Sequence, residues 1–380
     1  MLNTISPGHL ATIRLWYLVQ HSLPSFYKLI RHFGSAAAAT EAGNLQRWAE
    51  LGLHQNHLQR ARDFHQAQAQ ADFQHLLQRI QQHTDFILIP EDVGYPTQLL
   101  PYTDKPPILF GQGQAQPLLQ PQVAIVGSRK ASPHGRQVAY DFAYYLSEKG
   151  FFINSGLAQG IDEAAHQGGL KHQRTIAVMG TGLDLTYPAT HQGLRDQILQ
   201  QHGTIISEFL PQTKPLQQHF PRRNRIVSGL SLGVIVAEAT LDSGSLITAK
   251  LAAEQGKTVL AIPGHIYSEF HQGCHQLIRE GAILVDHPEQ VIEDLALPTQ
   301  WLSQQQATSS GTASAAAHPT LPEHLLALYS QLDWVGKNMD QLASELQQET
   351  AHLTAQLMEL ELLGMAMQQS GLYLRCRPSQ

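Results

Sequence analysis

The chain has 380 residues, a formal net charge of -6 and a pI near 6.4, and 42% of its residues are hydrophobic. This length predicts two or three domains, and the acidic balance excludes attraction to polyanions through net charge, so nucleic-acid binding would require a local basic patch. Two cysteines, Cys274 and Cys376, exclude a disulfide framework and a zinc site built on cysteine pairs.

No apolar run reaches transmembrane length, and the short one around Leu15 to Val19 lacks a cleavage signature. We therefore expect a cytoplasmic protein that does not enter the membrane. The 21 histidines are scattered and often flanked by Gln or Asn, and no His-Glu-x-x-His element occurs. Compositional bias explains them better than a metal site, so we expect no metal and no cofactor.

Residues 1–83 place apolar side chains at helical spacing, which predicts a small helical domain of the SAM or helix-hairpin-helix kind. A turn at Ser22–Ser25 and a stop at Gly34 predict a helical hairpin. Such hairpins contact nucleic-acid backbone in some proteins, although packing alone explains the pattern equally well. The expected buried side chains are Leu15, Leu18, Phe26, Leu29, Ile30 and Phe33.

Residues 84–300 alternate short β-rich runs with amphipathic stretches, which is typical of a parallel sheet with crossover helices. The sequence predicts an α/β domain with a Rossmann-like, doubly wound, mostly parallel sheet. A preceding segment that includes Ile87–Pro90 and Pro106–Phe110 is expected to pack on this sheet. The seven predicted strands are 123–126, 151–154, 175–179, 204–207, 234–238, 258–262 and 283–285.

Residues 301–320 consist mainly of Gln, Ala, Ser, Thr and Gly, which predicts a flexible linker. Residues 321–380 then read as three helices and a hairpin, the spacing of a winged-helix-like domain. The predicted helices start at Pro322 and cover 338–345 and 350–363, and the hairpin strands cover 365–369 and 372–375.

Unusual loops follow the predicted strands, at the edge where doubly wound sheets bind ligands. Glycines let backbone approach an anion, and helix N-termini and serine hydroxyls supply donors. Each loop alone is equally well explained as a turn, but together they favour a phosphate-lined groove. The loop residues expected to bind nucleic acid are Gly127, Ser128, Arg129, Lys130, Ser155, Gly156, Gly160, Gly180, Thr181, Gly182, Ser243 and Gly244.

A second basic element is the segment Phe220-Pro221-Arg222-Arg223-Asn224-Arg225-Ile226, with three guanidinium groups within four residues. Arginine matches phosphate with a planar fork and can stack on a base. A solvated basic turn is the simpler interpretation of such a triplet. Its position among the glycine loops instead favours nucleic-acid binding by Arg222, Arg223, Asn224 and Arg225.

Catalytic motifs are weak. No Walker A loop occurs, and the dinucleotide fingerprint lacks its third glycine and its ribose-binding acid. Asp162 and His166 are one helical turn apart and could form an acid/base pair, although such pairs are more often structural. Glu208 and Glu238 each end a strand and could face the groove. A nucleotide-processing Rossmann-like hydrolase is the alternative that these groups leave open, but no catalytic residue is predicted.

The pattern resembles the DprA/Smf family of DNA-processing proteins across residues 95–293. The shared elements are 123–129, Ser155–Asp162, 180–184 with Tyr187-Pro188, 220–230, Glu238-Ala239 and Ser243–Ser245 with Thr248-Ala249. The resemblance implies a dimeric, non-catalytic protein that binds single-stranded DNA and loads the RecA recombinase during natural transformation. It places Gly127, Ser128, Arg129, Ser155, Gly156 and Gly160 in the DNA pocket and Arg223, Asn224 and Arg225 on the family's Arg-Asn-Arg. The family's usual Asn is replaced here by His275.

The residues favour single-stranded over duplex DNA, because a row of anion-binding loops tracks one backbone and Arg or aromatic faces can stack on bases. Duplex recognition would require a basic recognition helix, but 350–363 contains Glu359 and Glu361 and no Lys or Arg. We therefore expect the C-terminal segment to bind a protein or to regulate. A structural adaptor that tethers a partner through this tail is a third hypothesis.

Overall fold

The computed structural model describes residues 5–295, 322–332, 337–348, 350–363, 365–369 and 372–375. These residues form two compact units, one inside Met1–Leu302 and one inside Ser303–Gln380. The predicted linker at 301–320 lies outside the described residues, as do the predicted hairpin turn at 370–371 and Cys376.

The first unit begins with helices whose ends follow from local signals. Ser6 and Ser22 cap the first two helices with their hydroxyls, each helix has a proline in its first turn, and the second ends at Gly34 with φ of 82°. The predicted stop at Gly34 is present, whereas Leu23–Ser25 of the predicted turn already belong to the second helix, and the hairpin stays a prediction. The helices are α1 (Pro7–Leu18), α2 (Leu23–Phe33), α3 (Ala36–Ala39), α4 (Ala42–Leu45), α5 (Gln55–Asp63) and α6 (Ala67–His83), with a 3-10 turn at Gln46–Leu51.

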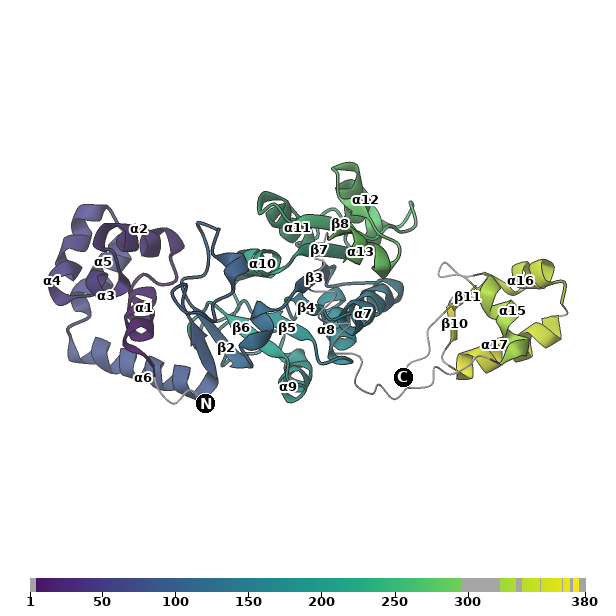
Figure 1. Cartoon of the computed structure of the whole chain (residues 1–380), viewed down its shortest axis with the longest axis horizontal. Helices are drawn as coiled ribbons and strands as arrows, with labels where there is room; N and C mark the ends of the chain where they lie inside the picture. The colour runs from purple at the N-terminus through teal and green to yellow at the C-terminus, as the bar shows by residue number, and fades with distance from the viewer. Residues whose placement is uncertain are drawn as a thin grey trace. The chain divides into compact units, whose positions relative to one another are not determined.

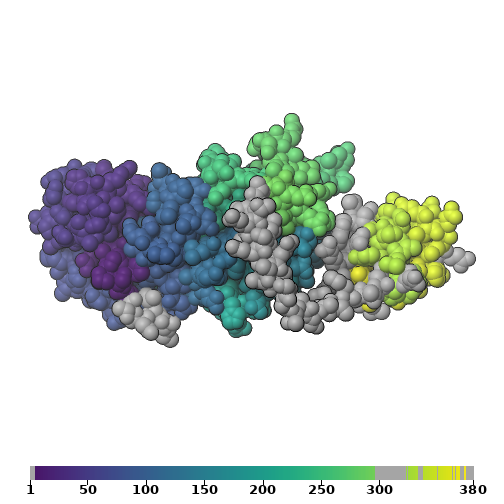
Figure 2. All heavy atoms as spheres, viewed as in Figure 1, coloured from purple at the N-terminus to yellow at the C-terminus, as the bar shows by residue number. Residues whose placement is uncertain are grey.

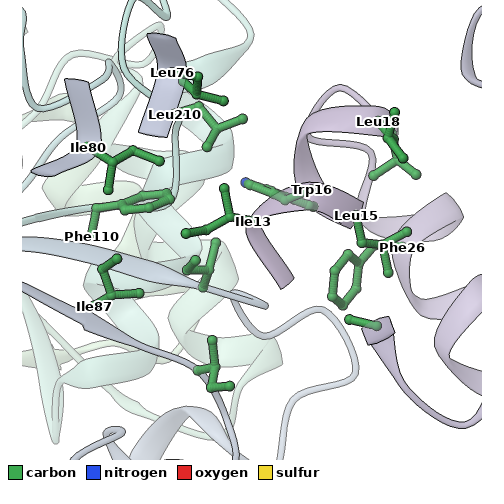
Figure 3. Close-up of a cluster of buried hydrophobic side chains, with 14 of the residues drawn as sticks. Ile13, Leu15, Trp16, Leu18, Phe26, Leu76, Ile80, Ile87, Phe110 and Leu210 are labelled. Carbon is green, nitrogen blue, oxygen red and sulfur yellow. The ribbon is translucent and has the colours of Figure 1, made fainter. Parts of the chain in front are cut away.

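The predicted contacts of α1 and α2 are buried or partly buried, and the same hydrophobic cluster continues into the sheet. Figure 3 shows Ile13 and Trp16 of α1 beside Leu210 and Phe110 of the sheet part. The indole Nε1 of Trp16 donates a hydrogen bond to the backbone oxygen of Glu208 at 2.8 Å. In Figure 2 the purple N-terminal helices and the blue segment after them lie against one another. The helices and the sheet therefore share one core.

The sheet has nine strands in the order β1-β2-β6-β5-β4-β3-β7-β8-β9. All seven predicted strands are present, with ends that differ by at most one residue. They are β3 (Gln122–Gly127), β4 (Phe152–Ser155), β5 (Thr175–Val178), β6 (Thr204–Ser207), β7 (Gly233–Glu238), β8 (Thr258–Ala261) and β9 (Ile283–Leu284), all parallel.

The two remaining strands correct the expectation that the segment before β3 only packs on the sheet. β2 (Leu109–Gly113) pairs antiparallel with β6, and β1 (Phe86–Leu88) pairs antiparallel with β2. The segment therefore extends the sheet through backbone hydrogen bonds, because an open strand edge offers unpaired N–H and C=O groups that another strand satisfies.

Alternate residues of the central strands point to opposite faces, as the period of a strand requires. Ala124 and Val126 of β3 pack in one cluster with helices α10 (His219–Leu230), α11 (Ser245–Glu254) and α12 (Gln272–Arg279). Val123 and Ile125 pack in another with α7 (Pro133–Glu148), α8 (Ile161–Leu170) and α13 (Pro288–Asp294). Helix α9 (Gln192–Gln200) joins β5 to β6. Figure 1 shows these helices on both sides of the sheet, as expected for a doubly wound fold.

The second unit contains the predicted elements in the predicted order. They are α15 (Glu323–Gln331), α16 (Met339–Leu346), α17 (Thr350–Leu362) and an antiparallel hairpin of β10 (Ala366–Gln369) and β11 (Leu372–Arg375). Asn338 starts α16 with a capping box. Leucines of the three helices form a separate core that includes Leu325, Leu328, Leu342 and Leu357.

In the ranges that the structure describes, no helix is both long enough and apolar enough to cross a bilayer. The same ranges place no group of three or more His, Cys, Asp or Glu side chains where it could hold a metal ion. Several of the histidines are buried apart from one another, for example His57 in the helical part and His166 on α8.

Candidate functional site

The strand order of the sheet reverses between β3 and β7, since β4 to β6 follow on one side of β3 and β8 and β9 follow on the other side of β7. Ligands of doubly wound sheets bind at the carboxyl ends of the strands beside such a point. The predicted loops after β3, β4 and β7 all start at this edge.

The loop after β3 presents two cations. The backbone N–H of Ser128 donates to the Glu238 backbone oxygen at 2.7 Å, and its hydroxyl accepts from the Lys130 N–H at 3.1 Å. Ser128 is buried by these contacts, whereas Arg129 and Lys130 are exposed. Of the predicted residues in this loop, Ser128 therefore fixes its shape, and Arg129 and Lys130 are available to a ligand.

Arg129 is part of a row of flat groups. Its guanidinium lies over the Phe220 ring, 5.1 Å from the centroid, and the Tyr187 ring centroid lies 5.3 Å from that of Phe220 with a tilt of 38°. The exposed fraction of Tyr187 is 42%. The row combines a positive charge with aromatic faces, which is the combination that binds phosphate and stacks on bases.

The loop after β4 is folded by its own polar groups. The Ser155 hydroxyl donates to the Ile125 backbone oxygen at 2.7 Å, and the Asp162 carboxylate accepts from the N–H groups of Gly156 at 3.0 Å and Ala158 at 3.4 Å. Gly160 has φ of 81°, and a Cβ there would collide with the Ser128 backbone oxygen. Ser155, Gly156 and Gly160 are all buried, so these predicted DNA contacts hold the edge together instead of presenting side chains.

Arg223 is only 4% exposed. Its Nη1 donates to the backbone oxygens of Gly156 and Val178, and its guanidinium lies where a Cβ of Gly156 would be. Burial lowers the pKa of Arg223 to about 10, with the charge of Arg129 acting in the same direction and Asp162 opposing both. Buried donors must be paired, and in this structure the Arg223 donors are paired with protein carbonyls. Binding of DNA by Arg223 stays a prediction.

The other two arginines of the triplet bind Glu208, which is fully buried. Arg222 Nε lies 2.8 Å from one carboxylate oxygen and Arg225 Nη2 lies 2.6 Å from the other. Arg222 also lies over the rings of Trp16 and Phe209. The triplet is thus paired with protein groups in this structure, and its role in nucleic-acid binding stays a prediction. The cause of the pairing is a buried carboxylate, which requires paired cations.

The side chains considered for catalysis are also engaged. Burial lowers the pKa of His166 to about 3, and its Nε2 accepts from the Leu157 N–H at 3.3 Å. Burial raises the pKa of Asp162, although Arg223 opposes the shift. Glu238 accepts from the Ser132 N–H at 2.9 Å and the Ser132 hydroxyl at 2.6 Å at the start of α7. In this structure these groups and Glu208 bond to loops and helix ends of the protein itself.

The remaining predicted residues divide between interior and surface. Gly180, Thr181 and Gly182 are buried, and the Gly182 N–H donates to the Thr213 backbone oxygen at 3.1 Å. After β7, Ser243 is partly exposed and Gly244 is exposed. Asn224 is partly exposed, and its Oδ1 accepts from Arg223 Nε at 3.1 Å.

His275 hydrogen-bonds to the loop after β8. Its Nε2 lies 3.1 Å from the Gly264 backbone oxygen and 3.4 Å from the Gly264 nitrogen. An imidazole can bond one of these groups in either tautomer. The replacement of Asn by His therefore keeps a side-chain hydrogen bond to this loop.

Phe220 and Tyr187 were not among the predicted binding residues. The sequence contained a signal for both, because Phe220 lies two positions before Arg222 and Tyr187 lies in the loop after β5. An aromatic side chain beside a basic segment is a sign of base stacking. The sequence does not show that the two rings meet, since 33 positions separate them.

Comparison with known proteins is consistent with this geometry. Residues 86–296 match the model of a family described as DNA recombination-mediator protein A. The chain is 42% identical over 294 residues to protein Smf of Escherichia coli strain K12, covering 76% of this chain and 77% of that protein. It is 45% identical over 226 residues to DNA processing protein DprA of Streptococcus pneumoniae strain R6, covering 59% of this chain and 79% of that protein.

Two solved structures are similar as well. The X-ray structure of DNA processing protein A from Streptococcus pneumoniae superposes with a TM-score of 0.67 at 36% identity, covering 78% of this chain and 100% of that one. A second structure is DNA processing protein A from Helicobacter pylori, which is described as giving insight into its single-stranded DNA binding mode. It superposes with a TM-score of 0.51 at 30% identity, covering 56% of this chain and 96% of that one.

Proposed function

The chain belongs to the DNA recombination-mediator protein A family, which includes the DprA and Smf proteins, and on that premise we propose that it binds single-stranded DNA at the carboxyl edge of its sheet without catalysing a reaction there. The observation that carries the proposal is the row of exposed Arg129, partly exposed Phe220 and exposed Tyr187 beside the β3/β7 reversal. Arg129 and Lys130 would bind phosphates and the rings would stack on bases, each stacked base contributing about 1–3 kcal/mol.

The buried predicted residues have a supporting role in this proposal. Arg223 holds the loop after β4 through the Gly156 carbonyl, and Asn224 fixes the Nε of Arg223. Backbone groups of Gly127, Gly160, Gly180 and their neighbours keep the edge in the shape that a phosphate chain needs. The glycine loops and the arginine triplet thus form the binding edge, while the direct side-chain contacts come from the exposed residues.

A gel-shift titration with single-stranded and duplex oligonucleotides over a salt series tests the proposal. Single strands should bind more tightly than duplex, with affinity that falls steeply with salt. Arg129→Ala should weaken single-strand binding about tenfold and reduce the salt slope by about 1. Arg279→Ala is the matched control, because Arg279 is exposed and ends α12, where the chain returns to the amino end of β9, opposite the carboxyl edge. Wild-type affinity of Arg129→Ala at every salt concentration would refute the role of the row.

We further propose that the bound strand is handed to the RecA recombinase in the cytoplasm during natural transformation, as the family resemblance implies. RecA filament growth on a strand coated with single-strand-binding protein measures this step. Adding the wild-type chain should shorten the delay before growth, and Arg129→Ala should shorten it less. An equal delay with and without the chain would contradict the proposal.

We propose that the chain acts as a homodimer that pairs through β9. This strand is the last of the described sheet, and its residues Ile283 and Leu284 are 37% and 48% exposed. An edge strand with exposed apolar side chains favours pairing with another copy.

We also propose that the N-terminal helices are a SAM-like module and that the second unit is a winged-helix-like module that binds protein. The order of three helices and a hairpin in the second unit supports its assignment. Its helix α17 includes Glu359 and Glu361 and no Lys or Arg, so it does not offer the basic surface that a DNA recognition helix requires.

A further inference from the structure

A groove of about 880 Å³ lies between the N-terminal helices and the loop that follows β6. None of its residues belongs to the row of Arg129, Phe220 and Tyr187. Its walls come from α1, α5 and α6 on one side and from Leu210–Thr213 on the other.

The α6 wall carries a polar stripe. His75, Arg79 and His83 recur at every fourth position, so they lie on one helix face at intervals of about 6 Å along the axis. The apolar residues Phe73 and Ile80 of the same helix are buried in the core. The stripe is therefore a face of α6 that the fold does not use for packing.

Two arginines of the groove are held in place by protein contacts. The Arg60 guanidinium lies 4.2 Å from the Tyr17 ring centroid, and its Nη2 donates to the Tyr17 backbone oxygen at 3.0 Å. Arg79 Nη1 lies 3.3 Å from an Asp184 carboxylate oxygen, yet the Arg79 side chain remains 43% exposed. Protein contacts thus hold each guanidinium in place. Because a guanidinium has five N–H donors, more than these contacts use, each arginine can still donate hydrogen bonds to a ligand.

The rest of the lining suits a polar anion. Asp72 is the one carboxylate among the described lining residues, against the guanidinium groups of Arg60 and Arg79. The amides Gln20, Gln78, Gln82 and Gln212 add donors and acceptors. Apolar lining is limited to parts of Tyr17, Leu76, Leu210 and Pro211, which is little for anchoring a protein helix.

The groove adjoins the proposed DNA edge. Its wall residue Gln212 donates its N–H to the Asp184 carboxylate at 2.9 Å, and Thr213 accepts from the Gly182 N–H at 3.1 Å. Gly182 and Asp184 lie in the loop after β5, which also carries Tyr187. A strand that stacks on Tyr187 can therefore follow this loop toward α6.

We propose that this groove binds the backbone of a second segment of the same single strand whose first segment occupies the edge at β3 and β7. The inference rests on the proposed function, since it extends the path of that strand. Arg60 and Arg79 bind its phosphates as forks, and the glutamine amides contact sugars and base edges.

The test compares two matched substitutions on α6 in the full chain. Gln78→Glu adds a negative charge in the groove, and Gln74→Glu adds the same charge one turn away on an exposed position outside it. Each variant is titrated with a short oligonucleotide of about 6 nucleotides and a long one of about 30. Gln78→Glu should weaken binding of the long strand about fivefold and leave the short strand unchanged, while Gln74→Glu changes neither.

Hydrogen exchange on the wild-type chain gives a second readout. The long strand should protect the amides of the Leu210–Thr213 wall and of α5 and α6, and the short strand should not. Equal long-strand affinity of Gln78→Glu and Gln74→Glu, with no such protection, would overturn the proposal and favour an acidic protein as the ligand of the groove. A wild-type chain that binds neither oligonucleotide would instead refute the proposed function.

Discussion

Glu208 is fully buried, and its two carboxylate oxygens lie 2.8 Å from Arg222 Nε and 2.6 Å from Arg225 Nη2. Burial acts to raise the pKa of Glu208, but Arg225 and Arg222 outweigh it and hold the pKa below its ordinary value. The backbone oxygen of the same residue accepts from Trp16. Glu208 thus connects α10 to the N-terminal helices, with its carboxylate holding Arg222 and Arg225 and its backbone oxygen bonding Trp16.

Glu208→Gln should destabilise the first unit by about 3–5 kcal/mol, because it leaves the half-buried Arg222 guanidinium without a charged partner and the buried Arg225 guanidinium with only the exposed Asp104. Urea unfolding followed by circular dichroism measures the change. Asp104→Asn is the control, since Asp104 lies 3.6 Å from Arg225 but is 54% exposed. If Glu208→Gln lowers the free energy of unfolding no more than Asp104→Asn does, the ion pairs of Glu208 with Arg222 and Arg225 contribute little to stability.

The lowered pKa of Glu208 also predicts a pH dependence. A carboxyl group with a folded pKa below its unfolded value contributes stability that is present above the unfolded value, here about 4.5, and is lost as pH falls through the folded pKa. The difference in stability between wild type and Glu208→Gln should therefore shrink below about pH 4.5. A difference that stays constant from pH 7 to pH 3 would contradict the assignment.

Gly160 closes the loop after β4 against the loop after β3. Gly160→Ala should destabilise the protein by about 2 kcal/mol or more, because its φ of 81° disfavours a side chain and the new Cβ meets the Ser128 backbone oxygen. Gly244→Ala is the matched control, since its added Cβ meets no atom within 4 Å. Thermal unfolding of both variants checks this, and equal melting temperatures would disprove the role of Gly160.

At the scale of elements, β1 and β2 cover one edge of the sheet, while β9 ends the other. β9 has only two residues, and both are exposed. The edges therefore differ in how they meet solvent, and we place the proposed association of two copies on the β9 side.

Leu284→Glu should convert the proposed dimer to a monomer, because a charge on the edge strand opposes pairing with a second copy. Sedimentation velocity measures the association state. Leu119→Glu is the control, as Leu119 is 43% exposed in the 3-10 turn before β3. A Leu284→Glu chain that still sediments as a dimer would move the interface elsewhere.

The elements were well predicted from the sequence, and their partners were not. β-branched runs such as Val123–Val126 predicted strands, and Ser22 and Gly34 predicted helix ends, because these signals act over a few residues. The inward direction of Arg223 depends on carbonyls of Gly156 and Val178, which are far along the chain. The pairing of β2 with β6 and the groove along α6 likewise depend on tertiary contacts between residues far apart in the sequence.

At the scale of the whole molecule, the described residues divide into two units with separate cores. All the loops of the proposed DNA edge belong to the first unit. The proposed binding of single-stranded DNA therefore belongs to the first unit, and a different contact is proposed for the second.

A chain that ends at residue 302 should bind a single strand within about twofold of the full-length affinity, because α17 offers no basic surface to a polyanion. Fluorescence anisotropy with the same oligonucleotide measures both chains at one salt concentration. A tenfold loss on truncation would assign part of the DNA surface to the second unit.

The reversal of strand order also determines when the edge can assemble. β3 needs β7 as its neighbour, and their paired residues, such as Val123 and Gly233, lie 110 positions apart. During synthesis, β3, β4, β5 and β6 leave the ribosome first, so β3 is a sheet edge until residues 233–238 have been made. Strand pairing over such a separation forms slowly. In a nascent chain, β3, the strand that leads to Arg129, therefore stays without its β7 neighbour for a long time.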